Sequence, residues 1–380
     1  KLTSDALAGI SSTWGYDATS GTLRTMQAGS GGITTVIAAA THGLGTLHRG
    51  QATAQITDPL GRVTRTQLDD RGRAVQTRTA DGGLWQWTRD AAGRVTTATD
   101  ALGYNTLYVR DAQGYVTLET LPGGATRSYV YGGPFHRLTS FTNERGHTWT
   151  TTHDSLGHVL TETNPLGDKW TYTYTTNGLV ETVEDPLNRI VHTYAYDSLR
   201  RLERDTNYAS DYAEWTYEAD GDLHTYRDEA GRVTTYTSDG MGRRTSEAAP
   251  IAGISTTWVY NGAGLLTSMT DAEGRISTSE YDSRGLLTRS TQAQGTATPA
   301  IELYTYDTAG QMTGTRDATG WWTSQTHDAV GRVTVVTDPL GFASRTQYDL
   351  AGRATAALDR LGQLTTWVYH PRGWVTSSTD

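Results

Sequence analysis

Short segments in which aromatic or apolar side chains alternate with polar ones recur along the chain. Trp170, Tyr172 and Tyr174, for example, are separated by single threonines. Because successive side chains of a β-strand point to opposite faces, this period of two predicts strands with one half-buried face. Six or seven residues separate one turn signal from the next, as between Gly93 and Asp100, which corresponds to a strand of about 20 Å.

The turn signal is Asp-x-x-Gly. Asp at the first position accepts a hydrogen bond from the backbone two residues later, and Gly at the fourth position takes a left-handed conformation that closes a three-residue hairpin with a G1 bulge. The motif occurs sixteen times in strict form, beginning at Asp58, Asp69, Asp90, Asp100, Asp111, Asp154, Asp228, Asp239, Asp271, Asp282, Asp307, Asp317, Asp328, Asp338, Asp349 and Asp359.

The spacing of these turns defines a repeat. From Asp307 onward the steps alternate between ten and eleven residues, so the full repeat is 21 residues long and contains two turns. No segment between turns is long enough for a crossover helix, so the strands are antiparallel. The sequence predicts an all-β fold, a long antiparallel β-meander ribbon. The turn residues singled out for this prediction are Asp58, Gly61, Asp90, Gly93, Asp282, Gly285, Asp307, Gly310, Asp338, Gly341, Asp349 and Gly352.

One of the two strand types in each repeat carries aromatic residues on a single face. Neighbouring strands lie about 4.8 Å apart, so these residues are expected to form an aromatic ladder across the sheet. The interpretation that we favour is a half-buried structural face, and the alternative is a surface that stacks on carbohydrate. The ladder residues are Trp170, Tyr172, Tyr174, Trp215, Tyr217, Trp258, Tyr260, Tyr304, Tyr306, Trp367 and Tyr369.

Composition and charge exclude several classes of protein. The 380 residues carry 32 Lys+Arg against 41 Asp+Glu, a formal net charge of −9 without a basic block, so we expect no nucleic-acid partner. No stretch approaches about 18 apolar residues, so we expect no membrane span. The chain contains no cysteine, so it has neither disulfides nor thiolate chemistry.

The repeat resembles the YD repeat of the RHS family. Residues 281–288 read Tyr-Asp-Ser-Arg-Gly-Leu-Leu-Thr, residues 348–355 read Tyr-Asp-Leu-Ala-Gly-Arg-Ala-Thr, and the alternating Thr-Asp-Pro-Leu-Gly-Arg-Val-Thr at 57–64 is similar to that family's second turn. The resemblance implies a β-ribbon that spirals into a hollow shell. Shells of this kind enclose a C-terminal toxin in bacterial polymorphic toxins and insecticidal toxin complexes, and teneurins use a similar shell in adhesion.

The resemblance is not uniform along the chain. We divide the chain into degenerate leading repeats at residues 1–56 and regular YD/RHS repeats at 57–380, with an insertion at 292–301. Asp380 begins a turn whose other residues are absent, so we expect the chain to be truncated inside that turn. Residues 57–380 hold about 31 strands, which makes a ribbon about 150 Å long, so we expect an arc of a shell that is too small to enclose a toxin alone.

Known catalytic and metal motifs fit poorly. The pair of turns at 164–167 and 185–188 approaches the spacing of an RHS self-cleavage motif, but the first begins with Asn and the second lacks Gly. Glu218, Asp220, Asp222 and Glu229 match part of a calcium loop, in which Leu223 stands where Gly is required. Most histidines considered occupy Tyr or Arg positions of the repeat. We therefore expect no enzyme activity, no catalytic residue, no metal and no cofactor.

The resemblance leads to a hypothesis about function. It implies a non-enzymatic shell segment, secreted or at the cell surface, that encloses and helps deliver a C-terminal effector. The partners implied are further RHS repeats of the same polypeptide, the enclosed effector domain and a secretion apparatus. The alternative is an extracellular adhesion protein whose aromatic rows bind glycans or another partner, and an enzyme that uses the turn carboxylates is the third hypothesis.

Overall fold

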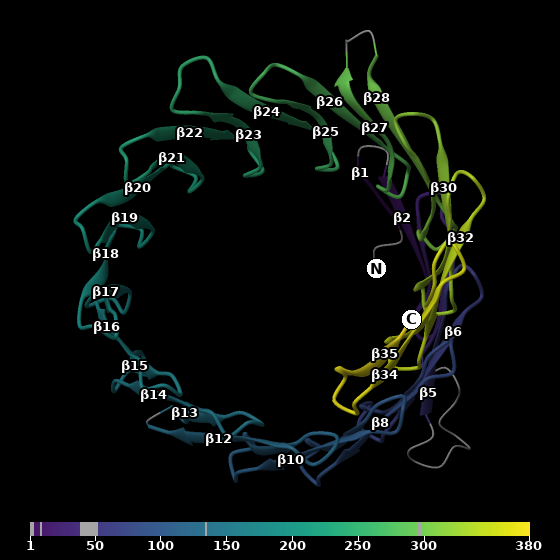
Figure 1. Cartoon of the computed structure of the whole chain (residues 1–380), viewed down its shortest axis with the longest axis horizontal. Helices are drawn as coiled ribbons and strands as arrows, with labels where there is room; N and C mark the ends of the chain where they lie inside the picture. The colour runs from purple at the N-terminus through teal and green to yellow at the C-terminus, as the bar shows by residue number, and fades with distance from the viewer. Residues whose placement is uncertain (1–3, 8–9, 39–51, 134, 295–297) are drawn as a thin grey trace. The chain divides into compact units, whose positions relative to one another are not determined.

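A computed structural model describes residues 4–7, 10–38, 52–133, 135–294 and 298–380. These residues contain 35 β-strands that belong to one sheet and no helix, so the all-β meander predicted from the sequence is confirmed (Figure 1). Within the described ranges there is also no helix that could cross a membrane.

Most strands are four to seven residues long and follow one another at the predicted spacing. They are β1 (Ser4–Leu7), β2 (Ile10–Tyr16), β3 (Leu23–Ala28), β4 (Thr34–Ile37), β5 (Ala52–Thr57), β6 (Val63–Leu68), β7 (Ala74–Arg78), β8 (Leu84–Arg89), β9 (Val95–Thr99), β10 (Asn105–Arg110), β11 (Val116–Thr120), β12 (Thr126–Gly132), β13 (Arg137–Thr142), β14 (Thr148–His153), β15 (Val159–Thr163), β16 (Lys169–Tyr174), β17 (Val180–Glu184), β18 (Ile190–Tyr196), β19 (Leu202–Asn207), β20 (Tyr212–Tyr217), β21 (Leu223–Arg227), β22 (Val233–Ser238), β23 (Arg244–Ala248), β24 (Ser255–Tyr260), β25 (Leu266–Thr270), β26 (Ile276–Tyr281), β27 (Leu287–Gln294), β28 (Ala300–Tyr306), β29 (Met312–Arg316), β30 (Trp322–His327), β31 (Val333–Thr337), β32 (Ala343–Tyr348), β33 (Ala354–Leu358), β34 (Leu364–Tyr369) and β35 (Val375–Thr379).

The chain divides into two compact units. Unit 1 comprises Lys1–Leu107, Tyr260–Ser268 and Arg275–Asp380, and unit 2 comprises Tyr108–Val259 and Met269–Gly274. In both units, strands that follow one another in the chain pair antiparallel, as β31 does with β32 through Val335 and Arg345. The boundary predicted near residue 57 lies inside unit 1. The predicted insertion at 292–301 falls partly outside the described residues, and the strands on either side of it, β27 and β28, are among the longest in the chain.

Hydrogen bonds close most of the turns in the same way. At the turn beginning with Asp338, the Gly341 amide donates to the Asp338 carbonyl (3.0 Å), and the Asp338 amide donates to the Phe342 carbonyl (2.9 Å). The Asp338 carboxylate also accepts the Leu340 and Phe342 amides (both 2.9 Å). Gly341 has φ +87°, a left-handed conformation that glycine adopts without strain.

Degenerate turns keep this geometry although they lack the glycine. Arg200, at the fourth position of the turn that begins with Asp197, has φ +66°, and its amide donates to the Asp197 carbonyl (2.9 Å). A side chain in this conformation costs about 1–2 kcal/mol, because Cβ approaches the carbonyl oxygen.

Replacing Arg200 with Gly is therefore expected to stabilise the protein by about 1 kcal/mol, because the left-handed strain is relieved. The measurement is the midpoint of urea unfolding, and Arg200→Ala is the control because alanine retains the strain. An Arg200→Gly protein no more stable than Arg200→Ala would contradict the prediction.

The sheet has almost no buried core. Of the described residues, the buried ones are Gly31, Gly83, Asp185, Ala213, Thr291 and Gly314. The sheet therefore has to gain its stability from backbone pairing, half-buried side chains and the side-chain networks at its edges, since a single layer cannot enclose a hydrophobic core.

Candidate functional site: the two edges of the ribbon and their seam

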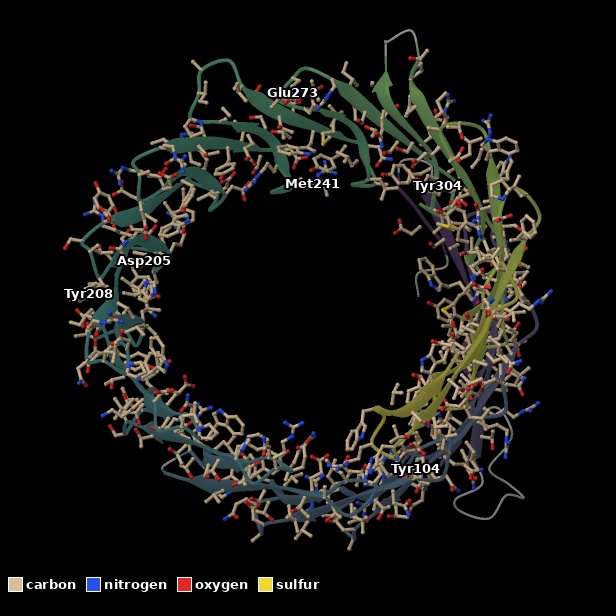
Figure 2. All side chains as sticks on the ribbon, viewed as in Figure 1. Tyr104, Asp205, Tyr208, Met241, Glu273 and Tyr304 are labelled. Atoms are coloured by element: carbon tan, nitrogen blue, oxygen red, sulfur yellow. The ribbon has the colours of Figure 1, made fainter. Side chains whose placement is uncertain are left out.

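The ribbon has two chemically different edges. Turns that follow an even-numbered strand are the YD turns, which begin with Tyr-Asp in their regular form, and they form the YD edge. Turns that follow an odd-numbered strand are the TD turns, typified by Thr57-Asp58, and they form the TD edge. In unit 2, Met241 lies in a YD turn and Glu273 in a TD turn, and Figure 2 shows them on opposite margins of the ribbon.

In several YD turns the first aspartate pairs with an arginine that also reaches the next repeat, as Arg201, Arg332 and Arg353 do. The Asp349 carboxylate accepts the Ala351 and Arg353 amides (3.0 and 2.9 Å), and Arg353 Nε donates to Asp349 Oδ2 (2.7 Å). Arg353 Nη1 then donates to the His370 carbonyl of the next YD turn (3.3 Å), and the guanidinium carbon lies 4.6 Å from the Tyr369 ring centroid. The pair therefore links successive repeats along the YD edge.

The tyrosine before the turn provides a second link. Its hydroxyl donates to a backbone carbonyl at the start of the preceding strand, usually 15 residues earlier, and this role was not predicted from the sequence. The only sequence signal for it is the fixed place of Tyr before Asp. The hydroxyls of Tyr174, Tyr196, Tyr217, Tyr281, Tyr306, Tyr348 and Tyr369 donate to the carbonyls of Val159, Val180, Leu202, Leu266, Leu287, Val333 and Ala354, at 2.6–3.0 Å.

Replacing Tyr348 with Phe is expected to cost about 1 kcal/mol, because the Val333 carbonyl loses its hydroxyl donor (3.0 Å) while the ring is retained. The measurement is the urea midpoint. Tyr208→Phe is the control, because Tyr208 is 63% exposed and should tolerate the change without loss. Equal effects of the two substitutions would argue against a stabilising role for the hydroxyl.

Inside unit 1 the TD edge of an early stretch contacts the YD edge of a late stretch. Gly32 N donates to the Thr308 carbonyl (3.0 Å), Ser11 N to the Ser283 carbonyl (3.3 Å) and Ser30 N to Ser283 Oγ (2.9 Å). We call this contact the seam, and Figure 1 shows these early strands beside the late ones. The backbone groups of one edge are thus satisfied by the other.

Two arginines cross the seam in opposite directions. From the TD edge, Arg62 Nη1 donates to Gln311 Oε1 (2.9 Å) and to the Asp328 carbonyl (3.1 Å). From the YD edge, Arg332 Nη2 donates to Asp81 Oδ2 (3.0 Å) while its Nε holds Asp328 Oδ2 (2.6 Å). Arg62 and Gln311 are 249 residues apart in the chain, and Arg332 and Asp81 are 251 apart, which is close to the 252 residues of twelve repeats.

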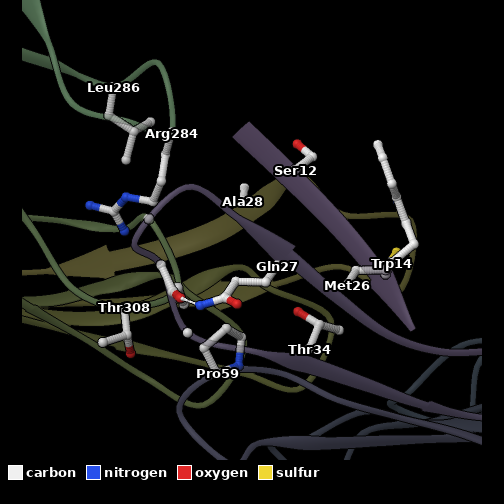
Figure 3. Close-up of a pocket in the computed structure, with 14 residues that line it drawn as sticks. Ser12, Trp14, Met26, Gln27, Ala28, Thr34, Pro59, Arg284, Leu286 and Thr308 are labelled. Atoms are coloured by element: carbon white, nitrogen blue, oxygen red, sulfur yellow. Dashed lines mark hydrogen bonds between the residues drawn. The ribbon is translucent and has the colours of Figure 1, made fainter. Parts of the chain in front are cut away.

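A cleft of about 370 Å³ lies in the seam. Figure 3 shows Trp14, Gln27 and Pro59 on the early side, with Arg284 and Thr308 on the late side. Arg284 is held by Asp282 Oδ2 (2.8 Å) and by the Asp307 carbonyl (2.7 Å). The cleft is therefore a gap between two docked edges with an arginine fixed in its wall.

The residues predicted as structural turns divide between the seam and the rest of the ribbon. Asp58, Asp282 and Asp307 lie in turns that contact the seam, and Gly310 lines the cleft. The turns at Asp90, Asp338 and Asp349 close by the same backbone hydrogen bonds. All six partner glycines have positive φ: Gly61, Gly93, Gly285, Gly310, Gly341 and Gly352.

The eleven ladder residues do not form a continuous stack of rings. The aromatic strands alternate with short strands, so a ladder residue is normally paired with a smaller side chain, as Tyr172 is with Val183 and Trp367 with Ser378. Trp215 differs, because it faces Tyr226 with ring centroids 5.5 Å apart. Ten of the eleven are half-buried, and Trp170 is 39% exposed.

In many turns the first aspartate has a lowered pKa, which favours its charged form. The Arg94 backbone N–H, followed by its guanidinium, holds the pKa of Asp90 below its usual range. Burial alone would raise the pKa of Asp328, but the backbone N–H and guanidinium of Arg332 outweigh it and lower that pKa. Elsewhere burial and the Glu162 carboxylate raise the pKa of Tyr172 to about 12.

No metal centre is present among the described residues, where no three His, Cys, Asp or Glu side chains cluster so as to hold an ion. In the partial calcium motif, Glu218 instead pairs with His224 (2.6 Å). The chemistry that the structure does display is recognition between edges through arginine, aspartate and backbone groups.

The fold and the seam define a repeat protein whose two ribbon edges are complementary. The family model described as RHS Repeat matches residues 89–131, 134–169, 153–190, 281–320, 306–343 and 327–363. The chain therefore carries RHS repeats over residues 89–131, 134–190 and 281–363 and is similar to RHS-repeat proteins. A comparison with curated proteins gave no match.

Several solved structures are similar to this chain. The crystal structure of TcdB2-TccC3-Cdc42 is 15% identical with a TM-score of 0.42, and the match covers 97% of this chain and 19% of that one. TcdB2-TccC3 is 12% identical with a TM-score of 0.42, covering 94% and 27%. The Photorhabdus luminescens Tc holotoxin pore is 16% identical with a TM-score of 0.41, covering 97% and 19%. This chain thus spans between about a fifth and about a quarter of the length of those chains.

Proposed function

We propose that this chain is a non-enzymatic wall segment of an RHS shell that encloses a C-terminal effector and helps to deliver it. The observation that carries the proposal is the seam, in which the TD edge of one stretch docks on the YD edge of another about 250 residues later. A ribbon whose edges recognise each other in this way can build a continuous wall. The mechanism is physical containment.

The seam also removes a hazard of open sheets. Free strand edges expose unpaired N–H and C=O groups that recruit other chains. Here Gly32 and Thr308 use such groups to join the two stretches, and Arg62 caps the Asp328 carbonyl. Edge pairing therefore serves both closure and solubility.

The state of the carboxylates supports a structural role. In the turns, Asp oxygens accept backbone N–H groups and arginine, as at Asp69, whose pKa the Arg73 backbone N–H lowers most. A general acid needs a carboxyl whose pKa is high enough to keep it protonated near the working pH. The pKa of Asp69 is lowered instead, so this carboxyl stays charged. The proposal therefore assigns no catalytic residue, cofactor or metal.

The remaining parts of the proposal concern partners and location. The wall would be completed by further RHS repeats of the same polypeptide and would contain the effector domain. Delivery would involve a secretion apparatus and place the protein outside the cell or on its surface. These parts rest on the match to the RHS Repeat family model.

Limited proteolysis of the natural polypeptide that includes residues 1–380 tests containment. The expected result is that its C-terminal effector domain resists cleavage in the native protein and becomes sensitive when Arg332→Ala weakens the seam. Arg353→Ala is the matched control, because Arg353 makes the same contacts within the YD edge. Ready release of a C-terminal domain from the native protein would overturn containment.

A second candidate function is glycan-binding adhesion, which the 39% exposure of Trp170 favours. The rings of some other ladder residues are covered by arginine side chains, which would compete with a sugar: Arg201 lies over Tyr217, and Arg353 lies over Tyr369. Glycan-array binding that is lost in the Trp170→Ala/Trp215→Ala protein would support adhesion, and an unchanged binding profile would exclude the ladder as the binding surface.

A further inference from the structure

Two arginines stand directly opposite each other on neighbouring strands of unit 1. Arg65 of β6 is paired with Arg78 of β7, so their side chains leave the same face of the sheet. Like charges in directly opposed positions of an antiparallel pair are destabilising. The pair therefore weakens the sheet unless a negative charge lies between the two guanidiniums.

No carboxylate of the described residues forms an ion pair with either arginine. Arg65 Nε donates to Gln55 Oε1 (3.0 Å), and Arg78 Nη1 donates to the Gly82 carbonyl (3.1 Å). Both acceptors are neutral, so the two positive charges are not compensated. Within the described part of the chain, no hydrogen bond engages the Nη groups of Arg65 or Nη2 of Arg78, and these donors are available.

The sequence around the pair is short of acidic residues. Residues 18–57 contain no Asp or Glu, so β5, which places Gln55 opposite Arg65, has no carboxylate to offer. Residues 52–99 contain seven arginines, five aspartates and neither Lys nor Glu. The charge of this stretch is 7 − 5 = +2, whereas the whole chain carries −9.

The aspartates of the two flanking TD turns are already engaged. Asp58 Oδ2 accepts Arg62 Nε within its own turn. Asp81 Oδ2 accepts Arg332 Nη2 across the seam (3.0 Å), and its Oδ1 accepts the Thr79 hydroxyl (2.6 Å). Neither carboxylate is therefore available to neutralise the opposed arginines.

A cavity of about 330 Å³ lies beside the opposed arginines, between the TD turns that begin at Asp58 and Thr79. Arg62, Arg65 and Arg78 all line it, and no Asp or Glu is among the described residues of its wall. The side chain of Arg62 is only 19% exposed. The cavity is thus a positively charged recess whose size falls within the range of pockets for small ligands.

We propose that this cavity binds a divalent oxyanion of the phosphate type, as phosphate or as a phosphate monoester, between Arg65 and Arg78. A dianion placed there would replace the repulsion of the two guanidiniums by charge-assisted hydrogen bonds, and the planar fork of arginine matches the oxygens of phosphate. A monovalent anion would neutralise only one of the two charges. The remaining volume of the cavity would hold the organic part of a monoester.

The cavity shares one residue with the seam. Arg62 lines the cavity, and its Nη1 donates to Gln311 Oε1 across the seam (2.9 Å). A ligand that binds only the folded state stabilises that state, so the bound anion should also stabilise unit 1 against unfolding. The site goes beyond the proposed wall function and does not depend on containment.

Isothermal titration calorimetry of the 380-residue chain with glycerol phosphate, in a chloride buffer of low ionic strength, tests the proposal. The wild type is expected to bind one monoester per chain. Arg65→Ala and Arg78→Ala should each weaken binding at least about tenfold, because each removes hydrogen bonds between charged groups. Circular dichroism of each variant verifies that it is folded.

Arg71→Ala is the matched control. Arg71 is exposed and lies in the YD turn that follows β6, so its removal changes the charge of the same stretch equally at the other edge of the ribbon. Binding to this variant should match the wild type. Weakening equal to that of Arg65→Ala would overturn the proposal, because it would show only general attraction of anions to a positively charged stretch.

Two further measurements complete the test. Sodium sulfate should displace the monoester, and sodium chloride at the same ionic strength should not. The monoester should raise the urea midpoint of the wild type, and Arg78→Gln in the same buffer should lose that rise, a comparison that cancels the general stabilisation by excluded salts. Absence of saturable binding at millimolar monoester, or an equal rise in Arg78→Gln, overturns the proposal.

Discussion

Acidification from pH 7 to pH 2 is expected to unfold the β-ribbon in a steep transition that begins near pH 4. Thirteen aspartates, nearly all at the first position of a turn, have pKa values below the ordinary Asp value of 3.8. They are Asp17, Asp58, Asp69, Asp90, Asp111, Asp154, Asp185, Asp197, Asp228, Asp239, Asp282, Asp317 and Asp328.

The direction of the effect follows from proton linkage. A carboxyl whose pKa is lower in the folded state binds fewer protons there than in the unfolded state. Its contribution to stability is complete above the unfolded pKa of 3.8 and is lost as the pH falls through the lowered folded value. Because many turns titrate in the same window, the losses add along the ribbon and make the transition steep.

Far-ultraviolet circular dichroism measures this transition, and Asn substitutions provide its control. Asn164 already occupies the first position of a turn, where its Oδ1 accepts the Leu166 and Asp168 amides (2.9 and 3.0 Å). A protein with Asp69→Asn, Asp90→Asn and Asp228→Asn should fold and unfold less steeply in acid. A midpoint above pH 5, or intact strands at pH 2, would contradict the prediction.

Replacing Arg332 with Ala is expected to destabilise unit 1 by about 2–3 kcal/mol, because the substitution leaves two partly buried carboxylates without their cation. Arg332 holds Asp328 in its own turn, donates to the Asp349 carbonyl of the next repeat (2.9 Å) and crosses the seam to Asp81. The side chains of Asp81 and Asp328 are only 13% and 19% exposed. The measurement is the urea midpoint.

Comparison with Arg353→Ala separates the part of the lost stability that comes from the contact across the seam. Arg353 makes the same bonds within its turn and to the next repeat, and it has a similar side-chain exposure of 20%. A double-mutant cycle of Arg332→Ala with Asp81→Asn should give a coupling energy of about 1 kcal/mol, and the cycle of Arg353→Ala with Asp81→Asn should give none. Equal coupling energies in the two cycles would show that the contact between Arg332 and Asp81 does not itself stabilise the seam.

The local structure was predictable because each determinant lies within a few residues. Asp338 and Gly341 specify their turn through bonds that span at most four residues, and the same holds wherever the motif recurs. Even degenerate copies such as the turn ending at Arg200 keep the geometry, because the neighbouring strands impose it. Element type, spacing and antiparallel order could therefore be inferred from sequence.

The aromatic face was predictable only in part. Alternation predicts that Tyr172 and Tyr174 share a face, but their neighbours depend on which residues the intervening strand contributes. Val183 and Val180 separate these rings from the next aromatic strand. The hydroxyl bond of Tyr174 to the Val159 carbonyl was missed because it joins residues 15 positions apart through a side-chain reach that no periodicity encodes.

By itself the sequence determined the hairpin turns, the strand lengths and the absence of any familiar catalytic motif, because these properties depend on short-range hydrogen bonding and on residue type. Tertiary structure alone decided that Arg62 meets Gln311 and that Arg332 meets Asp81. Those pairings join residues about 250 positions apart, and small changes in strand twist accumulate over that distance. A shift of the seam by one repeat would select different partners from nearly identical motifs, so the seam had to be read from the folded chain.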